Sequence, residues 1–209
     1  MSEKFVINVG RQLGSGGREI SSELAKRLDI SYYDKELLNV ASEESGLCKE
    51  FFEKADEQAS QPLTGGLFGM RFPFGGNSAM NTMNYLSNDA LFQIQSDAIR
   101  KLAEERSCLF IGRCADYILR DYPRCVNIFI SASLPFRIER IARIENISPA
   151  KAEEKIIHVE KRRAEFYNYY SNKRWGAAES YHLCIDSSVL GIGKTTDFIE
   201  QFVRAKLAL

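Results

Sequence analysis

Histidine is scarce in this sequence, and its cysteines follow no pairing pattern. Each of these two features argues against a class of chemistry. Only two histidines occur among the 209 residues, His158 and His182, and neither lies beside a serine or cysteine that would act as a nucleophile. A hydrolytic triad is therefore not expected. The five cysteines are scattered, without the C-x-x-C or Cys/His spacing of a zinc site. We predict no metal-ligating residues, and reduced, mostly buried thiols in a cytoplasmic protein.

An excess of charge and a long apolar run are also missing. Lys and Arg together number 28, as do Asp and Glu, so net charge argues neither for nor against a polyanionic partner. Any affinity for phosphate must come from the local placement of charge. No stretch approaches the roughly 20 apolar residues of a membrane span, and the N-terminus has no signal-peptide pattern. We expect residues 1–209 to form one domain, with neither a membrane nor a nucleic acid as partner.

A glycine-rich stretch lies between a predicted strand and a predicted helix near the start of the chain. Residues 5–9 are mostly β-branched or aromatic, as in a central strand. Ile20, Leu24 and Leu28 then repeat every four residues, as on one face of a helix. Between the two elements lie Gly10, Gly14, Gly16 and Gly17. Because a helix start offers unpaired N–H groups and glycine lets a ligand approach them closely, this stretch predicts an anion cradle, most often for phosphate.

This stretch departs from the standard P-loop motif, G-x-x-x-x-G-K-[ST]. If Gly16 takes the second glycine, the first glycine falls on Arg11 and the lysine falls on Gly17. The usual hydroxyl position falls on Arg18 or Glu19, and the nearest cations are Arg18 and Arg11. A glycine turn that only joins a strand to a helix remains an alternative.

Strands and helices alternate along the rest of the chain. This pattern predicts a three-layer α/β domain with a central parallel sheet of about five strands. The predicted strands are residues 5–9, 30–33, 108–111, 126–131 and 182–187. The predicted helices start near residue 20 and span 35–41, 47–58, 88–105, 135–146, 149–170 and 195–206.

A segment rich in glycine and phenylalanine, residues 59–86, interrupts this alternation as an insertion in the domain. A long loop that carries so much apolar surface is seldom without a role. Three interpretations remain open: a flap over a site, a contact with a second copy of the chain in a homodimer, or a poorly ordered loop.

Three groups of polar residues follow the ends of predicted strands. They are the glycine loop, Asp34 after the second strand, and Arg113 and Asp116 after the third. Because ligands bind beyond the carboxyl ends of parallel strands, we expect these groups to share one crevice. The planar guanidinium of Arg113 suits a phosphate clamp, with a surface ion pair as the alternative. Asp116 suits hydrogen bonds from a base or a ribose.

Two helical stretches carry arginines that suit a phosphoryl group. Arg137, Arg140 and Arg143 recur every three residues, and Arg162 and Arg163 form a second source of positive charge. Phosphoryl transfer needs positive charge around the oxygens of the moving group. A solvated basic face is the alternative for the first set.

With these residues in view, the chain resembles the cytidylate kinase-like family, a branch of the P-loop nucleoside monophosphate kinases. The resemblance runs from about Phe5 to Phe198 and is most specific at residues 10–20, 33–37, 111–117 and 175–176. It implies a parallel-sheet kinase fold with an arginine-bearing helical lid. It also implies phosphoryl transfer from ATP to CMP or a related monophosphate, with Mg²⁺ bridging the triphosphate oxygens.

The resemblance assigns roles to individual residues. The nucleoside triphosphate would lie on Gly14, Ser15, Gly16, Gly17, Arg18 and Glu19. The nucleoside monophosphate would be held near Asp34, Arg113 and Asp116. The catalytic cations would be Arg18, Arg137, Arg140 and Arg163. Since the Walker lysine is absent, a non-catalytic domain that binds a nucleotide or another phosphate ligand remains the alternative.

Overall fold

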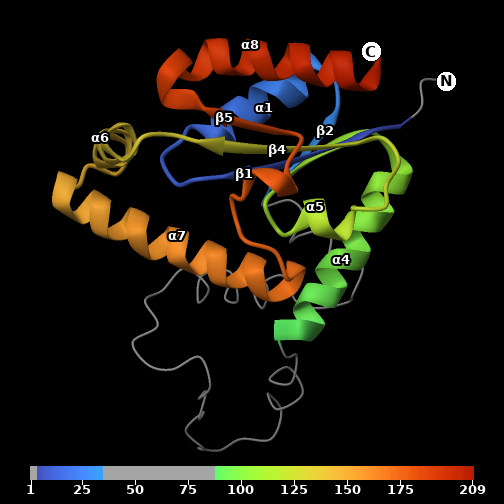
Figure 1. Cartoon of the computed structure of the whole chain (residues 1–209), viewed down its shortest axis with the longest axis horizontal. Helices are drawn as coiled ribbons and strands as arrows, with labels where there is room; N and C mark the ends of the chain where they lie inside the picture. The colour runs from blue at the N-terminus through green and yellow to red at the C-terminus, as the bar shows by residue number, and fades with distance from the viewer. Residues whose placement is uncertain (1–3, 35–87) are drawn as a thin grey trace, which may run out of the picture.

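One parallel sheet forms the centre of the molecule in the computed structural model, which describes residues 4–34 and 88–209 (Figure 1). Its five strands lie in the order β2-β3-β1-β4-β5. They are β1 Val6–Arg11, β2 Ser31–Tyr33, β3 Cys108–Ile111, β4 Cys125–Ser131 and β5 Leu183–Asp186. Central β1 pairs in parallel with β3 and β4, so that Val6 lies opposite Cys108 on one side and Cys125 on the other. The predicted parallel sheet is confirmed.

Helices connect the strands and carry the labels of Figure 1. They are α1 Gly17–Arg27, α4 Asn88–Glu105, α5 Ala115–Ile118, α6 Leu134–Glu145, α7 Pro149–Ser171, the 3₁₀ turn η1 Ala178–Ser180 and α8 Ser187–Leu207. Among the helices of the two described ranges, none is long and apolar enough to cross a bilayer. The predicted helices at 35–41 and 47–58 and the insertion at 59–86 lie outside the described residues.

The sheet is buried on both faces. Alternate residues of β1 point in opposite directions, so Ile7 and Val9 pack against α1 and α8 while Val6 packs on the side of α4, α5 and α7. Figure 1 shows the same order of layers, with α1 and α8 above the sheet and α4, α5 and α7 below it. This double burial explains why the strands are almost continuously apolar. The predicted three-layer α/β fold is confirmed.

Helices α6 and α7 pack against each other beside the glycine loop (Figure 1). Ile141 of α6 packs with Ala152 and Ile156 of α7, and Leu13 of the loop packs against the same cluster. The hydroxyl of Ser148 caps α7 by accepting a hydrogen bond from the Lys151 amide, and Pro149 occupies the first turn. The arginines predicted for a lid therefore lie on a helix pair that is anchored to the loop.

The last helix begins earlier than the sequence predicts. A start near residue 195 is expected because Gly193 and Lys194 are interpreted as a loop before a helix start. Instead α8 runs from Ser187, and Gly191 alone leaves helical geometry, with φ 74° and ψ 168°. The Asp186 carboxylate caps the new start by accepting a hydrogen bond from the Ser188 amide. Gly191 thus divides α8 into two helical segments that meet at a kink.

Candidate functional site

The glycine loop joins the end of β1 to the start of α1 and fits its surroundings only without side chains. Gly14 and Gly16 have φ of +83° and +75°, which disfavours other residues. A Cβ on Gly14 would lie 2.9 Å from both the Cβ and the main-chain oxygen of Arg137. One on Gly16 would lie 2.8 Å from the Cδ1 of Ile192. The loop backbone is therefore fixed between α6 and α8.

Some main-chain N–H groups of the loop donate hydrogen bonds within the loop, and others find no acceptor among the described residues. The Ser15 hydroxyl donates to the Gln12 carbonyl at 2.9 Å and accepts from the Gly17 amide at 3.3 Å. Within the described part of the chain, the main-chain N–H groups of Gly14, Gly16 and Glu19 make no hydrogen bond. Because these donors lie at the N-terminus of α1, they retain the character of an anion cradle.

A buried carboxylate lies next to the loop. Asp34, at the end of β2, is 6% exposed. Its Oδ2 accepts hydrogen bonds from Nε and Nη2 of Arg18, at 2.8 and 2.5 Å. The Nη2 of Arg11, which ends β1, lies 3.9 Å from the other oxygen, Oδ1. The structure thus brings the loop and Asp34 together, with two guanidinium groups around one carboxylate.

Arg113 enters the same region from the end of β3 on a strained turn. Gly112, Arg113 and Cys114 all have left-handed backbone, with φ of 66°, 60° and 55°. Such a conformation costs of order 1 kcal/mol at each non-glycine residue and is most often found at functional sites. A Cβ on Gly112 would lie 2.5 Å from Nη1 of Arg11, so this turn borders the Arg11 guanidinium.

Arg163 of α7 completes the group of arginines. Its Nη1 donates a hydrogen bond to the main-chain oxygen of Arg11 at 3.0 Å. Burial and the Arg163 charge lower the pKa of Arg11 to about 9, with Asp34 opposing and Arg113 and Arg18 adding to the decrease. Burial also lowers the pKa of Arg163. Arginines from β1, α1, the β3 turn and α7 therefore converge near Asp34, and we call Arg11, Arg18, Arg113 and Arg163 the arginine cluster.

Glu160 is a central residue that sequence reasoning missed. Its Oε1 accepts a hydrogen bond from the Leu13 amide at 2.7 Å and lies 3.5 Å from Nη1 of Arg163. Its Oε2 lies 3.5 Å from Nη1 of Arg137. Burial raises the pKa of this carboxyl, although the Leu13 amide and the arginines oppose the rise. The only sequence signal was an acid three residues before Arg163, which does not reveal the contact with the loop.

The three arginines of α6 have three different environments. Arg137 is buried, donates from Nε to the Ala132 carbonyl at 3.0 Å and pairs with Glu160. Arg140 donates to the Glu19 carboxylate at 2.6 Å, at the edge of the glycine loop. Arg143 is exposed. Neither a common phosphate-facing cluster nor a common solvated face describes all three.

Asp116 lies apart from the arginine cluster. It is in the first turn of α5, and its Oδ2 accepts a hydrogen bond from the Tyr167 hydroxyl at 2.6 Å. Burial raises the pKa of its carboxyl, while the Tyr167 hydrogen bond opposes the rise. Among the described residues, Asp116 has no ion pair with the arginine cluster. The structure therefore brings Asp34 and Arg113 to the loop but directs Asp116 towards α7.

Replacing Asp116 by asparagine is expected to change how stability depends on pH. Because the pKa of Asp116 is higher in the folded chain, the folded chain binds more protons between the unfolded and folded pKa values. The free energy of unfolding therefore falls as pH rises through that window. Asp116→Asn keeps an oxygen for Tyr167 and should flatten this decrease, as urea unfolding from about pH 4 upwards would measure. The exposed Asp121→Asn is the control, and an unchanged slope in Asp116→Asn would contradict the prediction.

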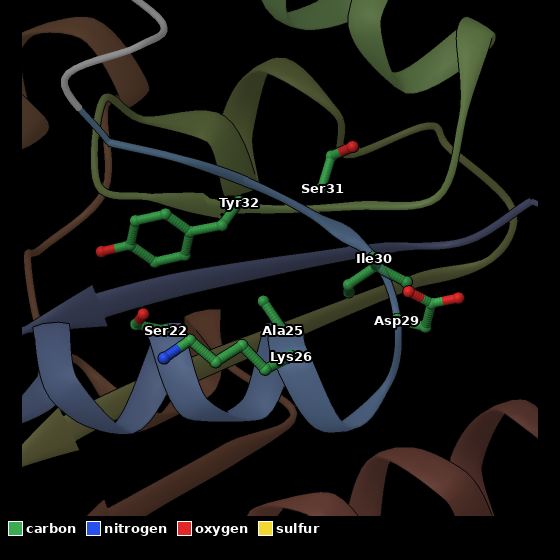
Figure 2. A pocket seen from close by; sticks show the side chains of 7 residues that line it. All are labelled: Ser22, Ala25, Lys26, Asp29, Ile30, Ser31 and Tyr32. Atoms are coloured by element: carbon green, nitrogen blue, oxygen red, sulfur yellow. The ribbon is translucent and has the colours of Figure 1, made fainter.

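A separate hollow of about 440 Å³ lies between α1 and β2. Figure 2 shows its lining side chains, which come from α1, from β2 and from the turn that joins them. Its charged side chains, Lys26 and Asp29, are both exposed. The hollow adjoins the C-terminal end of α1, whereas the glycine loop adjoins its N-terminal end. It is therefore not the site formed by the loop and the arginine cluster.

Comparison with solved structures shows the same fold in P-loop kinases. An uncharacterized protein from Eubacterium ventriosum is 25% identical over 96% of this chain and 98% of that chain, with a TM-score of 0.70. Shikimate kinase from Bacteroides thetaiotaomicron is 11% identical over 98% and 99% of the two chains, with a TM-score of 0.55. Shikimate kinase from Acinetobacter baumannii, in complex with shikimate, is 13% identical over 98% and 95%, with a TM-score of 0.53.

Comparison of sequences gives the family. No curated protein is significantly similar to this chain in sequence. The family model described as the cytidylate kinase-like family matches residues 6–189. That match includes the glycine loop, Asp34, the β3 turn and helices α6 and α7. With the P-loop kinase fold and the resemblance both confirmed, this chain belongs to the cytidylate kinase-like family.

Proposed function

We propose that this protein is a kinase that transfers the terminal phosphoryl group of ATP to CMP or a related nucleoside monophosphate. The observation that carries the proposal is the arginine cluster around Asp34, next to the glycine loop. Among the described residues, four guanidinium groups outnumber the carboxylates that pair with them, Asp34 and Glu160, and such an excess suits an acceptor that itself carries a phosphate. Membership of a kinase-like family supports the class of reaction.

In the proposed reaction, the bond between the terminal phosphorus of ATP and the bridging oxygen breaks, and ADP keeps the electron pair. A new bond forms from that phosphorus to an oxygen of the acceptor phosphate, which gives a nucleoside diphosphate. An ionised phosphate oxygen needs no base to remove a proton. The protein's contribution is therefore positioning and positive charge, which Arg113 and Arg163 are placed to supply.

The triphosphate would lie on the glycine loop, with its base on apolar side chains beside it. Gly16 borders Ile192 of α8, and the preceding residues Val189 and Leu190 are 76% and 41% exposed. Leu134 is exposed as well. It lies near the start of α8, since the adjacent Ser133 amide donates a hydrogen bond to the Ser188 hydroxyl at 3.2 Å. Exposed apolar side chains next to an anion cradle suit a nucleobase joined to phosphates.

The residues present fit Mg²⁺ with a single protein ligand. In the described ranges, no three His, Cys, Asp or Glu side chains gather as a metal site. Mg²⁺ at phosphates commonly takes one or two carboxylates, with the remaining positions filled by phosphate oxygens and water. Glu19 directly follows Arg18, which stands at the hydroxyl position of the motif, and its carboxylate is 60% exposed beside the loop. When bound, Mg²⁺ would neutralise charge on the triphosphate, and Glu19 is the residue that would hold it.

Arg113→Ala tests the proposed function. ADP release from ATP and Mg²⁺ should depend on an added monophosphate, and the variant should lower this turnover by about 10². The reason is the loss of a guanidinium that borders Arg11 at the end of β3. A coupled assay with CMP, UMP, AMP and GMP, with shikimate as a non-phosphorylated comparison, measures the effect. Arg204→Ala, on the exposed end of α8, is the control. No acceptor-dependent turnover across this panel would reject the proposal.

A second candidate is a phosphate-binding domain without catalysis. Gly17 and Arg18 stand at the lysine and hydroxyl positions of the P-loop motif, and Glu19 follows them. Glu19 also pairs with Arg140, and Arg18 pairs with Asp34, so neither charged group points freely at a phosphate. This candidate predicts ATP binding by calorimetry with no turnover. Turnover that survives repurification and is lost in Arg113→Ala would reject it.

A further inference from the structure

The glycine loop differs from the P-loop motif at two positions, and in opposite ways. Aligned on Gly16, the first glycine of the motif is Arg11 and the lysine is Gly17. A cation therefore stands where the motif needs none, and no side chain stands where the motif needs a cation. Taken separately, each difference would weaken phosphate binding. Their coincidence in one loop raises the question of whether one residue compensates for the other.

The geometry links the two positions directly. A Cβ on Gly17 would lie 2.7 Å from the Cβ of Arg11 and 3.1 Å from its Cγ. The aliphatic stem of Arg11 thus fills the space into which a side chain at 17 would extend. At its other end, the guanidinium of Arg11 borders Gly112, 2.5 Å from the position of a Cβ there. The stem passes over the start of α1 and brings the charge between the loop and the β3 turn.

Among the described residues, the charge of Arg11 has only one carboxylate partner, Asp34, at the outer limit of an ion pair. The Arg11 side chain is 20% exposed, and Asp34 is 3.9 Å away, beyond hydrogen-bond distance. Within the described residues, the Arg11 guanidinium donates no hydrogen bond. The hydrogen bonds of Arg18, by contrast, are directed at Asp34, and its side chain is 63% exposed. Of the two cations next to the loop, Arg11 is the one that is positioned for an incoming anion.

We propose that Arg11 supplies the cation that faces the triphosphate, in place of the Walker lysine, and that Gly17 is glycine to let the Arg11 stem pass. This inference rests on the proposed function for the identity of the anion. Arg18 then positions Asp34. The lowered pKa of Arg11 agrees with this role, because a cation destabilised by burial and by Arg163 gains most when a phosphate arrives.

The test is the binding of inorganic tripolyphosphate, which isothermal titration calorimetry measures on residues 1–209. Arg11→Met keeps the length of the stem without its charge, and it should weaken binding by at least about 10². Gly17→Lys alone should also weaken binding, because its Cβ meets the stem of Arg11. The double variant Arg11→Gly with Gly17→Lys restores the first glycine and the lysine of the motif and should bind at least about tenfold more tightly than Arg11→Gly alone. Arg204→Met is the matched control.

The outcomes separate this inference from the proposed function. Binding in Arg11→Met within threefold of the unaltered chain, or no rescue in the double variant, overturns the role of Arg11. If the unaltered chain binds tripolyphosphate in an Arg11-dependent way but shows no acceptor-dependent turnover, the kinase proposal fails while the role of Arg11 stands. An unaltered chain that binds no tripolyphosphate overturns both.

Discussion

Glu160→Ala is expected to lower the free energy of unfolding by about 3–5 kcal/mol, which is the usual cost of removing one partner from a buried ion pair. Glu160 compensates Arg137 and Arg163, and their side chains are only 10% and 26% exposed. Its Oε1 also accepts the hydrogen bond of the Leu13 amide in the glycine loop. The variant would leave a buried cation and a loop amide without their partner. Urea unfolding measures the change.

Two further variants separate charge from hydrogen bonding at this position. Glu160→Gln keeps an acceptor for the Leu13 amide and should lose less stability than Glu160→Ala. Glu165→Ala removes a carboxylate from the same helix, but that group is 47% exposed and lies 4.0 Å from Lys161. Its effect should stay within about 0.5 kcal/mol. A loss below about 1 kcal/mol in Glu160→Ala would show that Glu160 is not the group that joins α7 to the loop.

The sheet was predictable from sequence because burial on both faces leaves a strong local signal. A strand covered by helices on both sides is apolar at nearly every position, as Val6, Ile7 and Val9 are, although the buried Asn8 lies between them. The short helix α5 left no such signal, since four residues are too few for a helical period. The break at Gly191 was also unpredictable, because a glycine that kinks a helix and one that ends it look alike in sequence.

The site was predictable where it depends on strand ends and unpredictable where it depends on helix pairing. Asp34 and Arg113 follow parallel strands, and the topology alone brings them to the loop. Asp116 is only three residues beyond Arg113, but the left-handed turn and α5 direct it to Tyr167. Spacing on α6 could not show that Arg137 is buried, because its partner Glu160 comes from another helix.

Asp34→Asn should produce the clearest link between stability and anion binding. Without a ligand, we expect the free energy of unfolding to fall by about 2 kcal/mol, less than for a fully buried pair because Arg18 is 63% exposed. Adding sulfate or tripolyphosphate should then stabilise the variant more than it stabilises the unaltered chain. The anion takes over the role of the missing carboxylate. Thermal unfolding with increasing anion concentration measures both effects, with the exposed Asp121→Asn as the control.

A double-variant cycle would show which cation Asp34 compensates. If Arg11 carries the uncompensated charge, Asp34→Asn combined with Arg11→Met should recover much of the lost stability, because the remaining cluster no longer has an excess of buried charge. The same combination should abolish the additional stabilisation by tripolyphosphate. Recovery with Arg18→Met instead would identify Arg18 as the destabilised cation. Equal stabilisation by anions with and without Asp34 would mean that the carboxylate and the phosphate do not share these arginines, so the crevice would not be an anion site.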